Sequence, residues 1–74
     1  MVDTHEMTLS ASDYALLTSG NYIILNSIDI EVGDYVLFHE QDNPSSYAMT
    51  QINKITQHEG FKEGYALYTF SRLG

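Results

Sequence analysis

The chain has no cysteine and no tryptophan, a single proline, and only three basic residues in a length of 74. The absence of cysteine excludes disulfides and thiolate metal sites. The three histidines, His5, His39 and His58, are scattered and lack the close spacing of a histidine metal site. We therefore expect neither a metal nor another cofactor.

The shortage of basic residues leaves ten acidic side chains largely unbalanced, and the net charge is −7 with histidine neutral. Proteins that bind nucleic acids neutralise phosphates with lysine and arginine, which supply almost all of their non-specific affinity. This chain is poorly equipped for that role. The negative charge keeps a small domain soluble and monomeric, and it also suits contact with a basic protein partner.

Long apolar runs are absent too. No run approaches the roughly 18 residues that span a bilayer, and the N-terminal segment lacks the charged start and apolar stretch of a signal peptide. A chain of 74 residues has too little apolar surface for two cores. We expect a single cytoplasmic domain, residues 1–74, that is monomeric and does not bind membranes.

The clearest structural signal is the stretch Val32–Glu40. Gly33 and Asp34 form a turn, and the residues that follow are rich in β-branched, aromatic and aliphatic side chains. This pattern predicts a central strand over Tyr35–Glu40 that pairs with a strand on each side and faces a helix.

One segment has helical periodicity. Ser10 is a suitable N-cap, and Tyr14 and Leu17 then fall one turn apart. Gly20 follows at the position of a C′ glycine. We predict a helix over Ala11–Ser19 with Tyr14 and Leu17 buried.

Five other segments have strand patterns. Tyr22–Leu25 is continuously apolar and is predicted to be buried on both faces, with a turn at Asn26-Ser27 leading to a half-buried strand over Ile28–Val32. In Tyr47–His58 the apolar spacing breaks, which predicts a bulge near Gln51. The five are His5–Leu9, Tyr22–Leu25, Ile28–Val32, Tyr47–His58 and Tyr65–Leu73.

The central strand is followed by the turn cluster Gln41–Ser46, whose proline is excluded from a sheet interior because it cannot donate a ladder hydrogen bond. In total the chain has five to six short strands and one short helix. So small a sheet loses its exposed edges by curling. We predict an α+β, mainly β domain in the form of a small, partly closed β-barrel.

Five short motifs stand in the order found in a known family. They are Thr4-His5-Glu6-Met7, the helix end Ser19-Gly20, the turn Val32-Gly33-Asp34, the pair Glu40 and Asp42, and Phe61-Lys62-Glu63-Gly64-Tyr65. In this order they resemble the small, uncharacterised bacterial and phage members of the ASCH superfamily, which is related to the activating signal cointegrator domain. The resemblance spans about His5 to Phe70 and implies a PUA-like β-barrel.

The resemblance implies RNA binding, by analogy with PUA domains, and some relatives hydrolyse acetylated cytidine. The family has a lysine-rich segment, a threonine and a Glu-x-Arg stretch after the helix glycine, and these line its cleft. Here Asn21 and Tyr22–Leu25 occupy that region, and Thr8 and His39 replace two further basic residues. We therefore expect an RNA- or nucleotide-binding domain with a degenerate cleft, weak binding and no catalysis. The family positions that survive are His5, Glu6, Gly33, Asp34, Glu40 and Lys62.

Seven residues are candidates for a nucleic-acid site: His5, Glu6, Tyr22, His39, Lys54, Lys62 and Arg72. Adjacent strand residues point to opposite faces, so His5 and Glu6 do not form an acid–base pair without a bend. Tyrosines are able to stack on bases, but without interleaved cations core packing explains most of them better.

Three functions remain open on the sequence. An RNA- or nucleotide-binding domain predicts that the three cations cluster at one cleft. An acidic protein–protein interaction module predicts dispersed cations and a contiguous patch of Asp29, Glu31, Asp34, Glu40 and Asp42. An acetylated-nucleoside amidohydrolase ranks third, because the lysine and threonine that its relatives use have no counterpart.

Overall fold

Five strands and one helix make up the part of the chain that the computed structural model describes, residues 2–26, 29–57 and 59–73. In chain order they are β1 (Thr4–Leu9), α1 (Ala11–Ser19), β2 (Tyr22–Asn26), β3 (Tyr35–Glu40), β4 (Asn43–Thr56) and β5 (Tyr65–Leu73). Within these ranges, no helix has the length and apolar character needed to cross a membrane.

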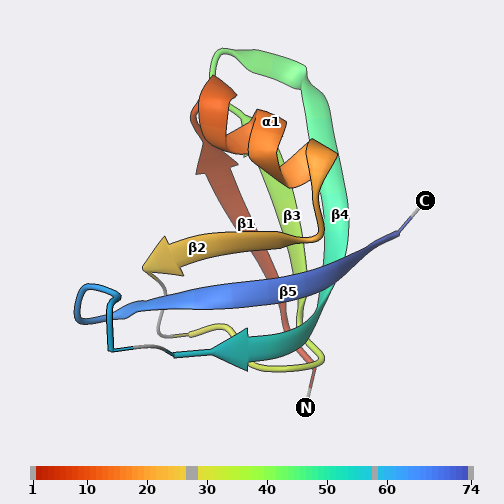
Figure 1. Cartoon of the computed structure of the whole chain (residues 1–74). Helices are drawn as coiled ribbons and strands as arrows, with labels where there is room; N and C mark the ends of the chain where they lie inside the picture. Colours follow the sequence, from red (N-terminus) through yellow and green to blue (C-terminus); the bar gives the residue numbers. More distant parts are fainter. Residues whose placement is uncertain (1, 27–28, 58, 74) are drawn as a thin grey trace.

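The strands form one sheet in the order β1-β3-β4-β5-β2, with β1 and β3 parallel and every other pair antiparallel. The sheet curls because β4 bends, pairing with β3 along its first part and with β5 along its later part (Figure 1). The result is a half-barrel with β1 and β2 as its edges, and α1, which links these two strands, contacts β1, β2 and β3. The predicted α+β, mainly β class and the partly closed barrel are confirmed.

Period-two alternation places one face of each strand in the core. Val36 and Phe38 of β3 are fully buried, and the ring of Phe38 lies 6.4 Å from that of Phe70 on β5. α1 adds Leu17, which is fully buried as predicted, and Tyr14, which was predicted to be buried and is only partly so. β3 pairs with β1 on one side and β4 on the other and contacts α1, as predicted, but the central strand of the sheet is β4. The core cluster consists of Leu9, Leu17, Ile23, Leu25, Ile30, Val36, Phe38, Ile52, Ala66, Tyr68 and Phe70.

Two irregularities in β4 account for its bend. Near its start, the register with β3 shifts between His39, which pairs with Tyr47, and Glu40, which pairs with Asn43. The second shift lies at Asn53, two residues beyond the bulge predicted near Gln51. Each extra residue increases the local twist, which lets one long strand serve both halves of the sheet.

The prediction that Tyr22–Leu25 is buried on both faces is wrong. Ile23 and Leu25 are buried, but Tyr22 is 56% exposed and Ile24 is 49% exposed. The reason is that the strand has one face on the core and the other in solvent, so every second side chain is exposed.

The strand predicted over Ile28–Val32 is also wrong. Ile30 is buried, but Val32 is 61% exposed and lies in a turn with Gly33, whose φ of +96° suits glycine. The turn predicted before this strand falls partly on residues 27 and 28, which lie outside the described residues. The hairpin does not form, since β2 pairs with β5.

The turn predicted over Gln41–Ser46 is too long. Only Gln41 and Asp42 form a turn, and β4 already begins at Asn43. At its other end β4 stops at Thr56, and the predicted strand end His58 lies outside the described residues.

The helix has the predicted bounds, Ala11–Ser19. At its start, Asp13 N–H donates to Ser10 Oγ at 3.3 Å, which confirms the N-cap. At its end, Gly20 N–H donates to the carbonyl of Leu16, but the φ of Gly20 is −135°. Gly20 therefore ends the helix at the expected position, but in an extended conformation that other residues adopt as well.

Candidate functional site

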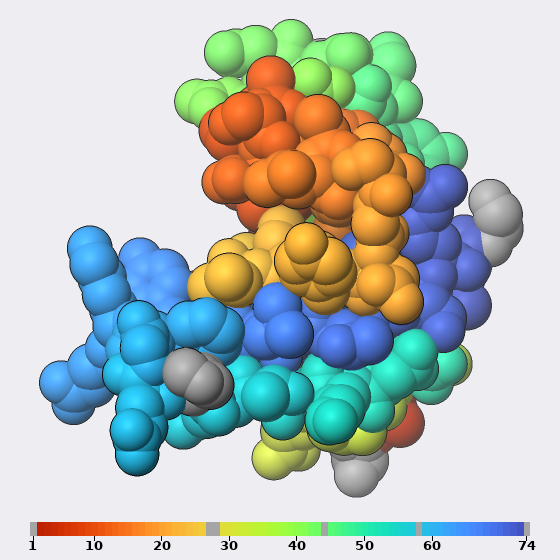
Figure 2. Space-filling model, in the orientation of Figure 1, coloured from red at the N-terminus to blue at the C-terminus, as the bar shows by residue number. Residues whose placement is uncertain are grey.

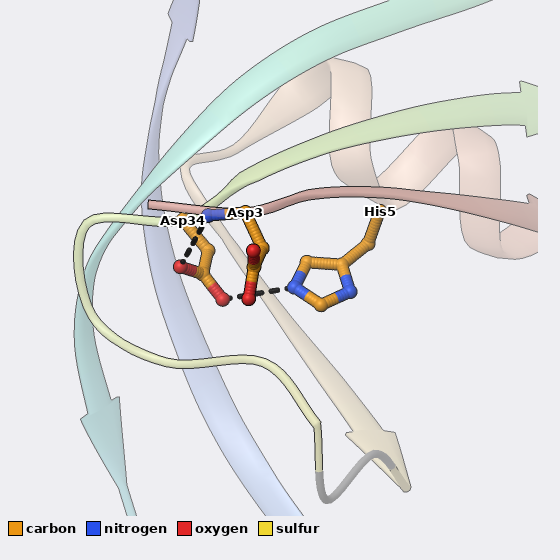
Figure 3. A group of neighbouring side chains, drawn as sticks. All are labelled: Asp3, His5 and Asp34. Atoms are coloured by element: carbon orange, nitrogen blue, oxygen red, sulfur yellow. Dashed lines mark hydrogen bonds and ion pairs between the residues drawn. The ribbon is translucent and has the colours of Figure 1, made fainter. Parts of the chain in front are cut away.

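A buried carboxylate joins two segments at one end of the half-barrel. Asp34, which is 2% exposed, accepts a hydrogen bond from Glu31 N–H at 3.0 Å through Oδ2 and one from Asp3 N–H at 3.2 Å through Oδ1. Its Oδ2 also lies 2.8 Å from His5 Nε2 (Figure 3). The start of β1 is thereby tied to the turn that precedes β3.

These contacts favour the ionised form of Asp34. The hydrogen bond from Glu31 N–H, followed by those from His5 and Asp3 N–H, lowers the pKa of Asp34 to about 2, against the opposing effect of burial. Because Asp34 is ionised at neutral pH, its carboxylate only accepts hydrogen bonds, so His5 Nε2–H is the donor of this hydrogen bond.

The same three residues are the one group in the described part of the chain with the donors of a metal site. One ligand atom each from Asp3, His5 and Asp34 lies within 4.8 Å of the others. A divalent cation would have to displace the proton of His5 Nε2 and compete with the N–H groups that already bind both oxygens of Asp34. The arrangement is that of a structural hydrogen-bond cluster.

The burial of Asp34 corrects the acidic patch expected for a protein-interaction module. The predicted patch includes Asp34, and this is wrong, because its carboxylate faces inward while Asp29 and Glu31 beside it are exposed. Sequence reasoning missed the cluster because it brings the first strand and the turn before β3 together through a parallel pairing that only the sheet topology determines.

Glu6 and His39 lie on the opposite face of the sheet from His5. His39 Nε2 is 3.6 Å from Glu6 Oε2, and the two side chains are 34% and 71% exposed. An exposed pair of this kind contributes little to stability. His5 and Glu6 point to opposite faces, as predicted for neighbours in a strand, and they do not form an acid–base pair.

Two of the three cations also face opposite sides of the sheet. Lys54 pairs with Thr69 of β5, three positions before Arg72, so the side chains of Lys54 and Arg72 project from different faces. Lys62 lies in the loop before β5. The predicted clustering of the three cations at one cleft is therefore wrong, since only Arg72 lines a groove in the described part of the chain. Arg72 instead reaches α1, where its guanidinium donates to the carbonyl of Thr18 at 3.0 Å.

A groove of about 420 Å³ lies between α1 and β2, and we call it the apolar groove. Figure 2 looks onto its two walls, α1 and the yellow-orange β2 below it. The residues that line it include Asp13, Leu16, Ser19, Gly20, Tyr22 and Ile24.

A smaller groove of about 230 Å³ lies between α1, the start of β4 and the end of β5, and we call it the arginine groove. The residues that line it include Tyr14, Thr18, Tyr47, Met49, Arg72 and Leu73. On α1, Leu16 faces the apolar groove and Thr18 faces the arginine groove, with the buried Leu17 between them.

The sequence-based candidates therefore fall at several places: His5 in the carboxylate cluster, Tyr22 in the apolar groove and Arg72 in the arginine groove. Tyr47 is a groove residue that the seven candidates omit. The sequence offers it only as one of several tyrosines able to stack on bases, because its place in the groove depends on the end of β5 lying beside the first half of β4.

No family model matches this chain, and a search of curated proteins finds no match. The resemblance to ASCH domains rests on its five short motifs.

Proposed function

We propose that this protein is a PUA-like domain of the ASCH type that binds a nucleotide, or the end of a single-stranded RNA, in the arginine groove. The observation that carries the proposal is that an exposed aromatic ring and an exposed cation line the same groove. Tyr47 is 63% exposed, and Arg72 is exposed as well. In single-strand binding proteins, bases stack on aromatic rings while cations contact the phosphates.

Arg72 is held in place for this role. A guanidinium has five N–H donors, and one donor of Arg72 bonds the carbonyl of Thr18 in the last turn of α1. The last carbonyls of a helix carry partial negative charge, and α1 has no basic residue of its own in that turn. The other donors of Arg72 remain for a phosphate, which arginine binds in a bidentate manner.

The charge of the protein keeps this binding weak. The net charge is −7, and Arg72 is the one cation that lines either groove in the described part of the chain. Neutralising one phosphate gives a shallow salt dependence, with a slope of about −0.7 for a single strand. A nucleotide or a chain end therefore fits better than a long RNA. The lysine and threonine used by related amidohydrolases have no counterpart, so the proposal includes no catalysis.

An amide-resolved NMR titration tests the proposal. The nitrogen-labelled domain is titrated with adenosine and uridine monophosphates and with a short mixed-sequence RNA, at low salt and at about 0.2 M salt. Shifts should cluster on Tyr47, Met49 and Arg72 and should fade at the higher salt. Shifts centred on His5 and Tyr22 would overturn the placement in the arginine groove, and silence at both salts would overturn the function.

Matched variants sharpen the test. Arg72→Met and Lys54→Met remove the same charge, but only Arg72 lines the groove. Arg72→Met should therefore weaken nucleotide binding about tenfold, and Lys54→Met should weaken it less than about twofold. Tyr47→Leu should cost about five- to tenfold through lost stacking, and the control Tyr65→Leu should cost little. Equal losses in a variant and its control would contradict the site.

A further inference from the structure

The outer edge of β2 presents backbone groups that point away from the sheet. The carbonyl of Asn21 accepts a hydrogen bond from Phe70 N–H at 2.9 Å, which sets the alternation of the antiparallel ladder with β5. By this alternation Ile23 bonds to β5, whereas the N–H and C=O groups of Tyr22 and Ile24 point to the other side. In the described part of the chain, β2 is the last strand on that side.

The apolar groove lies beside this edge. Tyr22 and Ile24 line it from β2, and Leu16, which is 64% exposed, lines it from α1. An edge strand normally carries charged side chains or a proline that discourage pairing with another chain. Here β2 has the sequence Tyr-Ile-Ile-Leu-Asn, with neither. The free backbone groups and the apolar side chains therefore occupy the same place.

We propose that an extended segment of a basic partner protein adds to the outer edge of β2 and places alternate apolar side chains in the apolar groove. In strand addition, main-chain hydrogen bonds supply affinity and pockets for every second side chain supply specificity. β2 has five residues, which span about 16 Å at about 3.3 Å per residue. A segment of about five or six residues matches this length.

The charge of the protein selects the partner. Asp13 lines the groove and the whole chain carries −7, so a segment with lysine or arginine between its apolar residues is attracted to it. A second copy of this chain is disfavoured as the occupant, because two molecules that each carry −7 repel one another. This site uses neither Tyr47 nor Arg72, so a test of peptide binding here is independent of a test of nucleotide binding.

Hydrogen exchange read by NMR tests strand addition directly. The probe is a capped hexapeptide of alternating lysine and valine. At saturation, exchange of the Tyr22 and Ile24 amides should slow by about tenfold or more, while exchange of the Ile23 amide, which already bonds to β5, should change little. Binding without this alternating protection would overturn the proposal.

Two N-methylated peptides are the matched controls, one methylated on its valines and the other on its lysines. Only the set whose N–H groups face β2 forms ladder bonds, so one control should lose binding and the other should keep it. Equal behaviour of the two would overturn strand addition. Protection of Tyr22 and Ile24 that grows with protein concentration in the absence of peptide would identify a second copy as the occupant and would also overturn the proposal.

A pair of protein variants completes the test. Ile24→Lys places a positive charge in the groove and should weaken peptide binding about tenfold or more through repulsion and lost apolar contact. Val32→Lys makes the same charge change at a similarly exposed residue outside both grooves, so it should have less than about a twofold effect. Equal weakening by both variants would show a general effect of charge and would contradict the site.

Discussion

The arginine groove and the apolar groove share α1 as a wall, yet they offer a ligand different chemistry. The arginine groove is bounded by β4 and β5, interior strands of the sheet, and it presents the side chains of Tyr47 and Arg72. The apolar groove is bounded by the edge strand β2, and it presents the backbone of Tyr22 and Ile24 beside apolar side chains. The position of a strand in the sheet thus decides whether a groove offers side chains or main-chain groups to a ligand.

The largest expected effect comes from the helix residue between the two grooves. Leu17 is fully buried, so Leu17→Asp buries an unpaired charge and should unfold the domain, with the loss of both grooves. Leu17→Ala should cost about 2–5 kcal/mol of unfolding free energy, a large part of the stability of so short a chain. Urea unfolding followed by circular dichroism measures both.

The neighbouring residue is the control for this prediction. Leu16 is 64% exposed, so Leu16→Asp should change the unfolding free energy by no more than about 0.5 kcal/mol. It should alter the apolar groove and leave nucleotide binding in the arginine groove unchanged. A folded Leu17→Asp variant with an unshifted NMR spectrum would refute the placement of α1.

Acid should destabilise the whole domain, and with it both grooves, by protonating Asp34, which lines neither groove. The pKa of Asp34 is lowered from 3.8 to about 2 in the folded protein, so its ionised form contributes stability above about pH 4. That contribution is lost as the pH falls through this window toward 2. The urea midpoint of the wild type should therefore decrease between about pH 4 and 2.

Two asparagine variants isolate the contribution of Asp34 to this acid effect. Asp34→Asn should be less stable than the wild type at neutral pH, because a neutral amide lacks the charge that the three N–H donors stabilise. This variant should also lack part of the acid-induced decrease in the urea midpoint. Asp29→Asn, at an exposed carboxylate, should retain the wild-type decrease. Identical pH profiles for the wild type and Asp34→Asn would contradict the role of the cluster.

The smallest expected effect touches the apolar groove alone. A methyl group at Gly20 would lie 3.5 Å from the carbonyl of Leu16 and 3.8 Å from the ring of Tyr22, which is ordinary contact. Gly20→Ala should therefore change the unfolding free energy by no more than about 0.5 kcal/mol, and it should modestly weaken peptide binding without affecting nucleotide binding.

A second glycine supplies the contrast. Gly64 has a φ of +85°, and an added Cβ would lie 2.8 Å from Asn26 Oδ1, so Gly64→Ala should cost about 1–3 kcal/mol in the same urea experiment. If Gly20→Ala proved as costly as Gly64→Ala, the extended conformation of Gly20 would be wrong.

Local patterns predicted the elements of this fold well where the chemistry was local. The Ser10 cap and the bounds of α1 depend on residues within one or two helical turns, and the alternation in β5 depends on a single strand. The sequence signals failed where the answer depends on a distant segment. Tyr22–Leu25 looks like a buried strand, but nothing in the described part of the chain covers the outer face of the sheet there, and every second residue is exposed.

The candidate site follows the same division. The sequence singled out His5, Tyr22 and Arg72 individually, but it could not show that His5 meets Asp34, that Tyr22 lies beside a free strand edge, or that Arg72 shares a groove with Tyr47. These arrangements join or order segments that are distant along the chain, and strand pairing brings them about. A search for function in the sequence therefore finds residue types, whereas the grooves exist only in the assembled sheet.

By itself, the sequence determined the mainly β composition, the position of the helix, the burial of Leu17 and the acidity that restricts the choice of ligand, because composition and short-range periodicity suffice for these. The tertiary structure alone decided the strand order β1-β3-β4-β5-β2, the burial of Asp34 and the open edge of β2. The physical reason is that hydrogen bonds between strands join backbone groups, which are the same in every residue, so the pairing is selected by how the whole core packs and not by any one stretch of the chain.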